Sequence, residues 1–438
     1  MFANGDDMLG LQKKLQKNEQ SRGSVASRTI VRKKGLKRRL GLNFSLIFMA
    51  LFCLVGMTQA TPSAESLMQK AWGLNSGYGV EAPKAWMQMS HSCSTSGIVV
   101  AVIDTGIDIS HPALKNNLWV NEKEAKGKPG VDNDGDGFVG DIHGWDFAKN
   151  SGNLSDSHGH GTHISGIISG NGSDVDSFKG VCPGVKIMAL RYYDPNGSGD
   201  DNLKNTVRAI NFAVDHHADI INYSGGGAEF AQPEYEALKR AEKAGILVVA
   251  AAGNERSNAD QNLYFPAAYN LTNIIAVTAI DEKGQVLPSS NWGVKKVHVA
   301  APGQSILSSL PNGGYGFMTG TSQATAFVSG IAALIKSENP SASFSKVKEL
   351  IEQSSQKFPQ LVGKTATGAK VNAFLAIQLA HGRKVSSDGA AVKDGQGQLD
   401  ASSEQAVTVK RIEKPKASLK TRLRRSKILI RARQKQAE

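Results

Sequence analysis

Short, strongly apolar runs recur along the middle of this chain and alternate with longer segments of helical character. The apolar runs lie at residues 98–103, 185–191, 220–223, 247–251 and 274–279, and the helix-like segments lie at 203–217 and 233–243. A strand that is apolar on both faces must be covered on both sides, which is the usual condition of a parallel sheet. The pattern therefore predicts an α/β protein in which helices cover a parallel sheet.

The first apolar run ends on a carboxylate. Residues 97–103 lead into Asp104, Thr105 and Gly106, a pattern typical of a buried strand that breaks into a turn. Such a residue lies at the carboxyl edge of the sheet, where open α/β proteins bind their ligands. The structural alternative is a turn or helix-capping aspartate, which is common after a strand.

A histidine motif follows later in the chain. His160, Gly161, Thr162 and His163 begin a segment of small residues whose glycines let a helix pack closely against a strand or a substrate. With His158, these histidines offer metal binding as an alternative. Zinc-binding histidines on a helix are usually four residues apart beside a carboxylate, so the spacing favours a catalytic imidazole at His160.

A serine stands where a loop turns into a helix. Ser322 precedes the apolar run 327–335, so the helix dipole favours negative charge developing beside it, although a serine there is otherwise an N-cap. A serine hydroxyl is a weak nucleophile that needs an imidazole to accept its proton and a carboxylate to orient that imidazole. Asp104, His160 and Ser322 supply one candidate for each role, as in a serine peptidase.

A fourth element is an amide donor at the end of another apolar run. Residues 244–253 form a buried-strand pattern that ends on Asn254. The side-chain amide of Asn254 can hold the oxyanion of a tetrahedral intermediate.

Five ordered motifs, at residues 104–108, 159–163, 218–222, 251–254 and 320–322, resemble those of the subtilase family, the subtilisin-like serine proteases. The resemblance runs from about residue 72 to about residue 380. It implies a three-layer subtilisin-like fold with a mostly parallel central sheet flanked by helices. It also implies Asp104, His160 and Ser322 as the triad, and Asn254 with the Ser322 backbone amide as the oxyanion hole.

The resemblance further implies a substrate cleft along two short segments. They consist of Ser224, Gly225 and Gly226, and of Ala251, Ala252 and Gly253. Two departures from the family pattern stand out. Gly225 replaces a frequent leucine and removes an apolar wall from the expected cleft, and residues 323–327 replace the usual sequence behind the nucleophile, which changes the expected helix packing.

An acidic, glycine-rich loop predicts a calcium site. Asp132, Asp134, Asp136 and Asp141 stand around glycines that let a tight loop turn several hard oxygens toward one cation. The loop resembles calcium-binding loops, but it has no glutamate at the position that corresponds to the twelfth residue of an EF-hand loop. The alternative is a solvated loop that binds no ion. A second calcium site of the family is in doubt, because Ala113 stands where an aspartate is common.

The formal charge of +12 belongs to the ends of the chain. Residues 1–40 and 410–438 together carry 23 of the 51 Lys and Arg residues but 5 of the 39 Asp and Glu residues. The stretch between them is net acidic, which argues against a nucleic-acid groove on the folded core. The basic ends are instead candidates for contact with an anionic cell envelope.

The N-terminal region of the chain predicts export. Residues 1–60 read as a basic leader plus a signal peptide whose apolar part is 43–57, with an uncleaved N-terminal anchor as the alternative. A peptidase domain is expected at 72–380, and a disordered basic tail at 383–438. Only about ten residues separate the expected cleavage point from the domain, so the usual folding propeptide is expected to be missing.

Two cysteines, Cys93 and Cys182, remain after the signal peptide. In an oxidising compartment they are candidates for one disulfide, with two buried thiols as the alternative.

The sequence thus predicts a secreted, periplasmic or envelope serine endopeptidase that acts on polypeptides through an acyl-enzyme, with structural calcium. Its rivals are a transpeptidase or peptide ligase of the same fold, and a non-catalytic surface scaffold.

Overall fold

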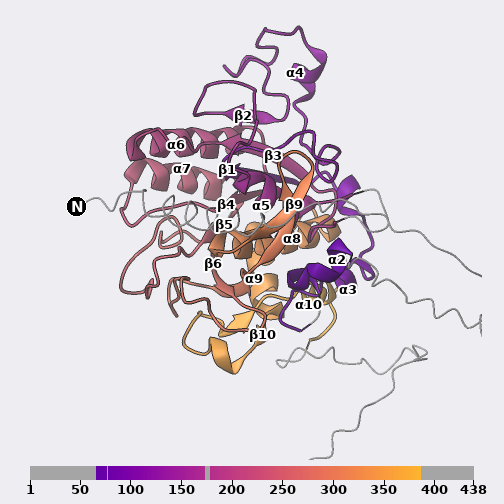
Figure 1. Cartoon of the computed structure of the whole chain (residues 1–438), viewed down its shortest axis with the longest axis vertical. Coiled ribbons are helices and arrows are strands. Elements are labelled where there is room, and N and C mark those ends of the chain that lie inside the picture. Colours follow the sequence, from indigo (N-terminus) through magenta and orange to yellow (C-terminus); the bar gives the residue numbers. More distant parts are fainter. Residues whose placement is uncertain (1–65, 76, 173–177, 386–438) are drawn as a thin grey trace, which may run out of the picture. The chain divides into compact units, whose positions relative to one another are not determined.

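The computed structural model describes residues 66–75, 77–172 and 178–385 (Figure 1). The predicted leader and signal peptide at 1–60 lie outside the described residues, and so does the predicted tail from residue 386 onward. Within the described ranges, no helix combines the length and the apolar character needed to cross a bilayer.

A nine-stranded sheet forms the centre of the described fold, in the order β10-β11-β7-β6-β5-β4-β1-β3-β2. All of its pairs are parallel except β10 with β11. Its strands are β1 (Val99–Asp104), β2 (Gly144–Asp146), β3 (Lys186–Arg191), β4 (Ile220–Tyr223), β5 (Leu247–Ala251), β6 (Ile274–Ile280), β7 (Val299–Pro302), β10 (Gln356–Lys357) and β11 (Ala369–Lys370). A separate antiparallel pair consists of β8 (Ile306–Leu310) and β9 (Gly314–Met318).

Helices connect the strands and cover the sheet. They are α2 (Leu67–Lys70), α3 (Ala82–Trp86), α4 (Glu122–Lys126), α5 (His160–Ser169), α6 (Gly199–Asp215), α7 (Gln232–Lys243), α8 (Thr321–Glu338), α9 (Phe344–Ser354) and α10 (Ala373–Ala380). Short 3₁₀ turns lie at Trp72–Leu74, Cys93–Thr95 and Pro359–Leu361.

Successive residues of the central strands point into two different hydrophobic cores. In β1, Val100 and Val102 join the core that contains α5, α8, α9 and α10. The next residues, Ala101 and Ile103, join the core beneath α6 and α7, which lie side by side in Figure 1. Because both faces of the strand are buried, its sequence is apolar throughout. The result is the three-layer α/β fold with a mostly parallel sheet that the sequence predicts.

The predicted strands agree with the observed ones to within one residue at each end, but one helix begins earlier than predicted. The helix predicted at 203–217 is α6, which begins at Gly199. Its N-cap is Ser198, whose hydroxyl accepts a hydrogen bond from the backbone N–H of Asp201 at 3.1 Å. The polar first turn hides the start of the helix from a search for apolar periodicity.

Helix α8 carries the candidate nucleophile into the middle of the protein. Every residue from Thr321 to Ser337 is buried, so the helix is enclosed on all sides rather than amphipathic. A side chain at Gly330 would lie 2.5 Å from Cβ of Val181, which is why a residue without a side chain is needed there. The helix therefore has little freedom to shift relative to the sheet.

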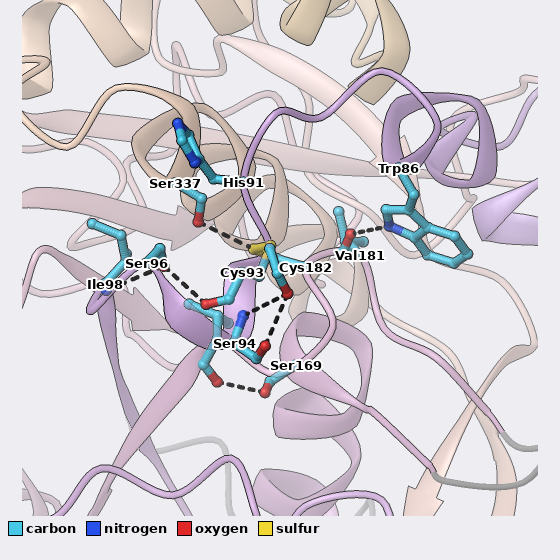
Figure 2. Close-up of a disulfide and its surroundings, with 12 residues drawn as sticks. Trp86, His91, Cys93, Ser94, Ser96, Ile98, Ser169, Val181, Cys182 and Ser337 are labelled. Carbon is cyan, nitrogen blue, oxygen red and sulfur yellow. Dashed lines mark hydrogen bonds between the residues drawn. A yellow bond between two sulfur atoms is a disulfide. The ribbon is translucent and has the colours of Figure 1, made fainter.

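Cys93 and Cys182 form a disulfide, with their Cα atoms 5.7 Å apart (Figure 2). Cys93 precedes β1 and Cys182 precedes β3, and these two strands are neighbours in the sheet. The sulfur of Cys182 also lies 3.8 Å from the hydroxyl of Ser337 on α8. The disulfide thus joins segments 89 residues apart at the entry to the central strands, and the alternative of two buried thiols does not hold.

Candidate active site

The four candidate catalytic residues come from elements that are far apart in the sequence. Asp104 is the last residue of β1, His160 is the first residue of α5, and Ser322 lies in the first turn of α8. Asn254 follows β5 after a short turn. Strands β1, β4 and β5 are parallel neighbours, so their carboxyl ends meet at one edge of the sheet.

Asp104 and His160 form a direct pair. The imidazole donates from Nδ1 to Oδ1 of Asp104 at 2.7 Å, and the carboxylate is almost completely buried. Burial by itself would lower the pKa of His160, but the charge and the hydrogen bond of Asp104 raise it above the ordinary value. The same hydrogen bond places the proton on Nδ1 and leaves Nε2 free to accept one.

A second buried carboxylate, Asp156, holds this pair in place. Asp156 accepts hydrogen bonds from the Thr105 hydroxyl at 2.9 Å, from Gly159 N–H at 2.7 Å, and from both the N–H and the hydroxyl of Thr162. Thr105 in turn accepts from the N–H of Gly161 at 2.9 Å. Asp156 therefore ties the start of α5 to the end of β1. No periodicity or motif in the sequence marks this role.

Gly161 explains why the motif around His160 needs a glycine. A side chain on this residue would overlap the carbonyl oxygen of Gly106 and would lie 3.2 Å from Cβ of Asp104. Its absence lets the first turn of α5 approach the end of β1 closely enough for the Asp104–His160 hydrogen bond.

Ser322 and Asn254 are arranged around the start of α8. The side-chain oxygen of Asn254 accepts from the N–H of Thr321 at 3.1 Å, which orients the amide and leaves its NH₂ group available as a donor. In the described part of the chain, the Ser322 hydroxyl donates to the carbonyl of Ser224 at 3.1 Å rather than to His160. Catalytic hydrogen bonds of this kind often align only when substrate is bound.

The two predicted cleft segments leave neighbouring strands. Residues 224–226 follow β4 and residues 251–253 include the end of β5, with Tyr223 paired to Ala250 in the register. The space beside Gly225 is not open as the sequence suggested. A side chain there would overlap the hydroxyl of Tyr192 and lie 3.0 Å from Cε2 of Tyr223, so aromatic residues already form a wall at this position.

The acidic loop brings its four predicted residues into two separate groups of potential metal ligands. Asp132 and Asp134 lie together with Glu124 of α4, and Asp136 and Asp141 lie together with His216. Glu124 and His216 were not predicted as ligands, because each lies outside the loop.

Two observations fit a cation at this loop. Oδ1 of Asp134 is buried without a hydrogen-bond partner among the described residues. Asp141 is completely buried, and burial raises its pKa to about 7 although Asn121 donates to it. Carboxylate oxygens are the ligands that calcium prefers.

The three histidines of the motif do not form such a group within the described residues. His163 is buried, and its Nε2 lies at hydrogen-bonding distance from the carbonyl oxygens of Ile306 and Gly316. His160 is engaged by Asp104.

Comparison with known proteins identifies a family that the sequence matches. The sequence model of the Subtilase family matches residues 95–397. The chain is 38% identical over 289 residues to the major intracellular serine protease of Bacillus subtilis (strain 168), a match that covers 65% of this chain and 80% of the relative.

Other relatives are longer than the matched region. Subtilisin-like protease 1 of Plasmodium vivax is 31% identical over 298 residues, which cover 64% of this chain and 47% of the relative. The thermophilic serine proteinase of Bacillus sp. (strain AK1) is 34% identical over 283 residues, which cover 65% of this chain and 62% of the relative.

Proposed function

Because the chain belongs to the subtilase family and is a subtilisin-like serine endopeptidase, we propose that Asp104, His160 and Ser322 are its catalytic triad and that Asn254 supplies an oxyanion donor. The observation that carries this proposal is the 2.7 Å hydrogen bond between His160 and Asp104, formed at the sheet edge that Ser322 and Asn254 share. Membership of a peptidase family and similarity to serine proteases favour an active enzyme over the non-catalytic scaffold considered from the sequence.

The first half of the proposed reaction is acylation. Nε2 of His160 takes the hydroxyl proton of Ser322 while Oγ attacks the carbonyl carbon of the scissile bond. The carbonyl oxygen becomes an oxyanion, which accepts hydrogen bonds from the Asn254 amide and the Ser322 backbone N–H. His160 then donates the proton to the leaving amine, and the C–N bond breaks. Asp104 stabilises the imidazolium and keeps Nδ1 protonated throughout.

The second half is hydrolysis of the ester on Ser322. His160 removes a proton from a water molecule, which attacks the acyl carbon and forms a second oxyanion in the same position. The collapse of this intermediate returns the proton to Ser322 and releases the carboxylate product. A competing amine in place of water would form a new peptide bond, so the ratio of hydrolysis to amine capture separates a peptidase from a ligase.

Polypeptides are the substrates of this enzyme class, and we assign their binding to residues 224–226 and 251–253. Residues 225 and 226 extend beyond the end of β4, and we assign to their backbone groups the pairing with an extended peptide. In the other segment, the Ala252 N–H already donates to Val277 O at 3.0 Å, and Asn291 donates to the carbonyl oxygens of Ala252 and Gly253, so this segment is proposed to line the cleft. Five of the six residues are glycine or alanine, which lets a substrate backbone come close.

The acidic loop is proposed to bind structural calcium. Asp132, Asp134, Asp136 and Asp141 would supply oxygen ligands, and Glu124 adds a carboxylate to the first of the two groups. The unpartnered oxygen of Asp134 supports the assignment. Bound calcium would neutralise carboxylates that otherwise repel one another, and it would hold the loop between α4 and β2.

Export is proposed on two grounds. The disulfide between Cys93 and Cys182 suits an oxidising compartment, and residues 43–57 have the pattern of a signal peptide. We assign the peptidase domain to residues 72–380, with secretion or retention in the periplasm or cell envelope. The basic ends are proposed to contact the envelope, without nucleic-acid binding by the folded core.

A fluorophosphonate probe tests the catalytic assignment directly. The probe reacts with an activated serine and not with ordinary hydroxyls, so mass spectrometry of the labelled protein identifies the nucleophile. We expect labelling at Ser322, strong reduction in His160→Ala and none in Ser322→Ala. Labelling at another serine, or unchanged labelling in His160→Ala, would contradict the proposed triad.

A further inference from the structure

An aromatic residue is held against the proposed substrate cleft by backbone pairing. Gly227 and Phe265 form an antiparallel bridge, with Gly227 N–H donating to Phe265 O at 2.9 Å and Phe265 N–H donating to Gly227 O at 2.7 Å. This bridge carries Tyr264, the residue before Phe265, alongside Gly226 at the end of the first cleft segment.

The ring of Tyr264 spans the distance between the two cleft segments. A Cβ atom built on Gly226 would lie 2.7 Å from Cε1 of Tyr264, and one built on Gly253 would lie 2.9 Å from Cδ2. These two ring atoms are diametrically opposite each other. Both separations are shorter than van der Waals contact, so the ring touches one glycine on each side and fills the space between them.

A second group narrows the same space beside Gly253. The carboxylate of Glu255 lies where a side chain on Gly253 would project. Asn291, which is buried, holds it there by donating from Nδ2 to Oε2 of Glu255 at 2.6 Å and by accepting from the Glu255 N–H at 3.1 Å. The carboxylate is therefore positioned rather than free to swing away.

The position of the reacting carbonyl indicates which substrate side chain meets this ring. The carbonyl carbon must lie against Oγ of Ser322, which contacts the carbonyl of Ser224, while its oxygen points to Asn254. Ser224 begins one cleft segment and Asn254 directly follows the other. The side chain of the acyl residue, which precedes the scissile bond, therefore enters between the two segments and meets Tyr264.

We propose that Tyr264 determines specificity by closing this subsite, so that the enzyme cleaves after residues with small side chains such as alanine or serine. The inference rests on the catalytic and cleft assignments proposed above. A large aromatic or branched side chain would have to displace this ring, whose backbone is positioned by the adjacent Gly227–Phe265 bridge, and the Glu255 carboxylate opposes an acidic side chain.

Tetrapeptide p-nitroanilides that differ only in the residue before the scissile bond test the proposal. For the wild type we expect kcat/KM with alanine to exceed that with phenylalanine by about 100-fold, the scale on which pockets discriminate side-chain size. Tyr264→Ala should raise the phenylalanine-to-alanine ratio of kcat/KM by at least about 10-fold. Tyr264→Phe keeps the ring without its hydroxyl and should retain the wild-type preference.

Several outcomes would overturn the proposal. If Tyr264→Ala does not fold, the kcat/KM values of the wild-type enzyme with the set of p-nitroanilides are the test. A kcat/KM with phenylalanine or leucine before the scissile bond that equals the value with alanine would show that the ring does not close the subsite. A preference for lysine would show that Glu255 dominates, and an unchanged ratio in folded Tyr264→Ala would remove the role of the ring. If the fluorophosphonate probe labels Ser322 while the ratio fails to change, only the specificity inference fails. Absence of labelling would overturn both proposals.

Discussion

Replacing Asp156 by asparagine is the sharpest test of how the proposed catalytic pair is positioned. One oxygen of Asp156 accepts from the Thr105 hydroxyl and from the N–H groups of His158 and Gly159, and the other accepts from the N–H and hydroxyl of Thr162. An asparagine has a single acceptor oxygen. Its NH₂ group would have to face either the Thr162 donors or the other set, and at least one buried N–H would lose its acceptor.

The structure sets the size of the effect. Leaving a buried donor unsatisfied costs about 1–3 kcal/mol, and loss of the charge-assisted bonds adds to that. We expect Asp156→Asn to lower the free energy of unfolding by about 2–4 kcal/mol. At roughly 2 cal/mol/K of unfolding entropy per residue, this corresponds to a decrease in Tm of roughly 3–6 °C for a domain of this size.

The assay combines a thermal melt with a pH profile. The melt is measured in a Ser322→Ala background, so that self-digestion does not contribute, and Asp200→Asn on the exposed first turn of α6 is the matched control. Because the charge of Asp156 also raises the pKa of His160, Asp156→Asn should move the acid limb of kcat/KM to lower pH. An unchanged Tm together with an unchanged acid limb would refute the positioning role of Asp156.

Three further predictions follow from the site and the disulfide. The pKa of His160 is raised above the ordinary value of 6.5 and its neutral form is the base, so kcat/KM should fall as the pH decreases through a midpoint above 6.5. A stopped assay across about pH 5–9 measures this midpoint. A midpoint below 6.5 would contradict the Asp104–His160 pairing. Chelation of calcium should lower Tm by several degrees, with restoration by added calcium but not by magnesium, and an unchanged melt would refute the assignment of Asp132 and Asp134. The Cys93→Ser, Cys182→Ser double variant should have a free energy of unfolding lower by about 2–4 kcal/mol in denaturant, because the disulfide joins residues that are 89 apart in the sequence. An unchanged free energy of unfolding would show that the disulfide does not stabilise the fold.

Much of the candidate site was predictable because its residues stand at the ends of regular elements. Asp104 ends an apolar strand, Ser322 begins an apolar helix, and Asn254 follows a third apolar run. Each of these is a local pattern of hydrophobicity that stops at a polar residue. The direct hydrogen bond between His160 and Asp104 was not predictable from these patterns, because it depends on the close approach of the first turn of α5 to the end of β1.

Other residues had no local signal. Asp156 lies in a loop and acts through backbone N–H groups that any sequence would offer. Glu124 joins the acidic loop from α4 and His216 joins it from the C-cap of α6, and Tyr192 fills the space beside Gly225. In each case the partner is distant in the sequence, and no residue type at the one position specifies the other.

The sequence by itself determined the layers of this protein and the polar residues at which its apolar strands end. It also determined which residues are the candidate nucleophile, base and carboxylate. These features depend on hydrophobic periodicity and side-chain chemistry, which are properties of short segments. The tertiary structure alone decided what surrounds them. The burial of Asp156, the division of the acidic loop into two groups and the ring of Tyr264 between Gly226 and Gly253 depend on the paths of loops and on a bridge such as Gly227 with Phe265. These contacts are set by close packing in three dimensions, which brings together residues that are distant in the sequence.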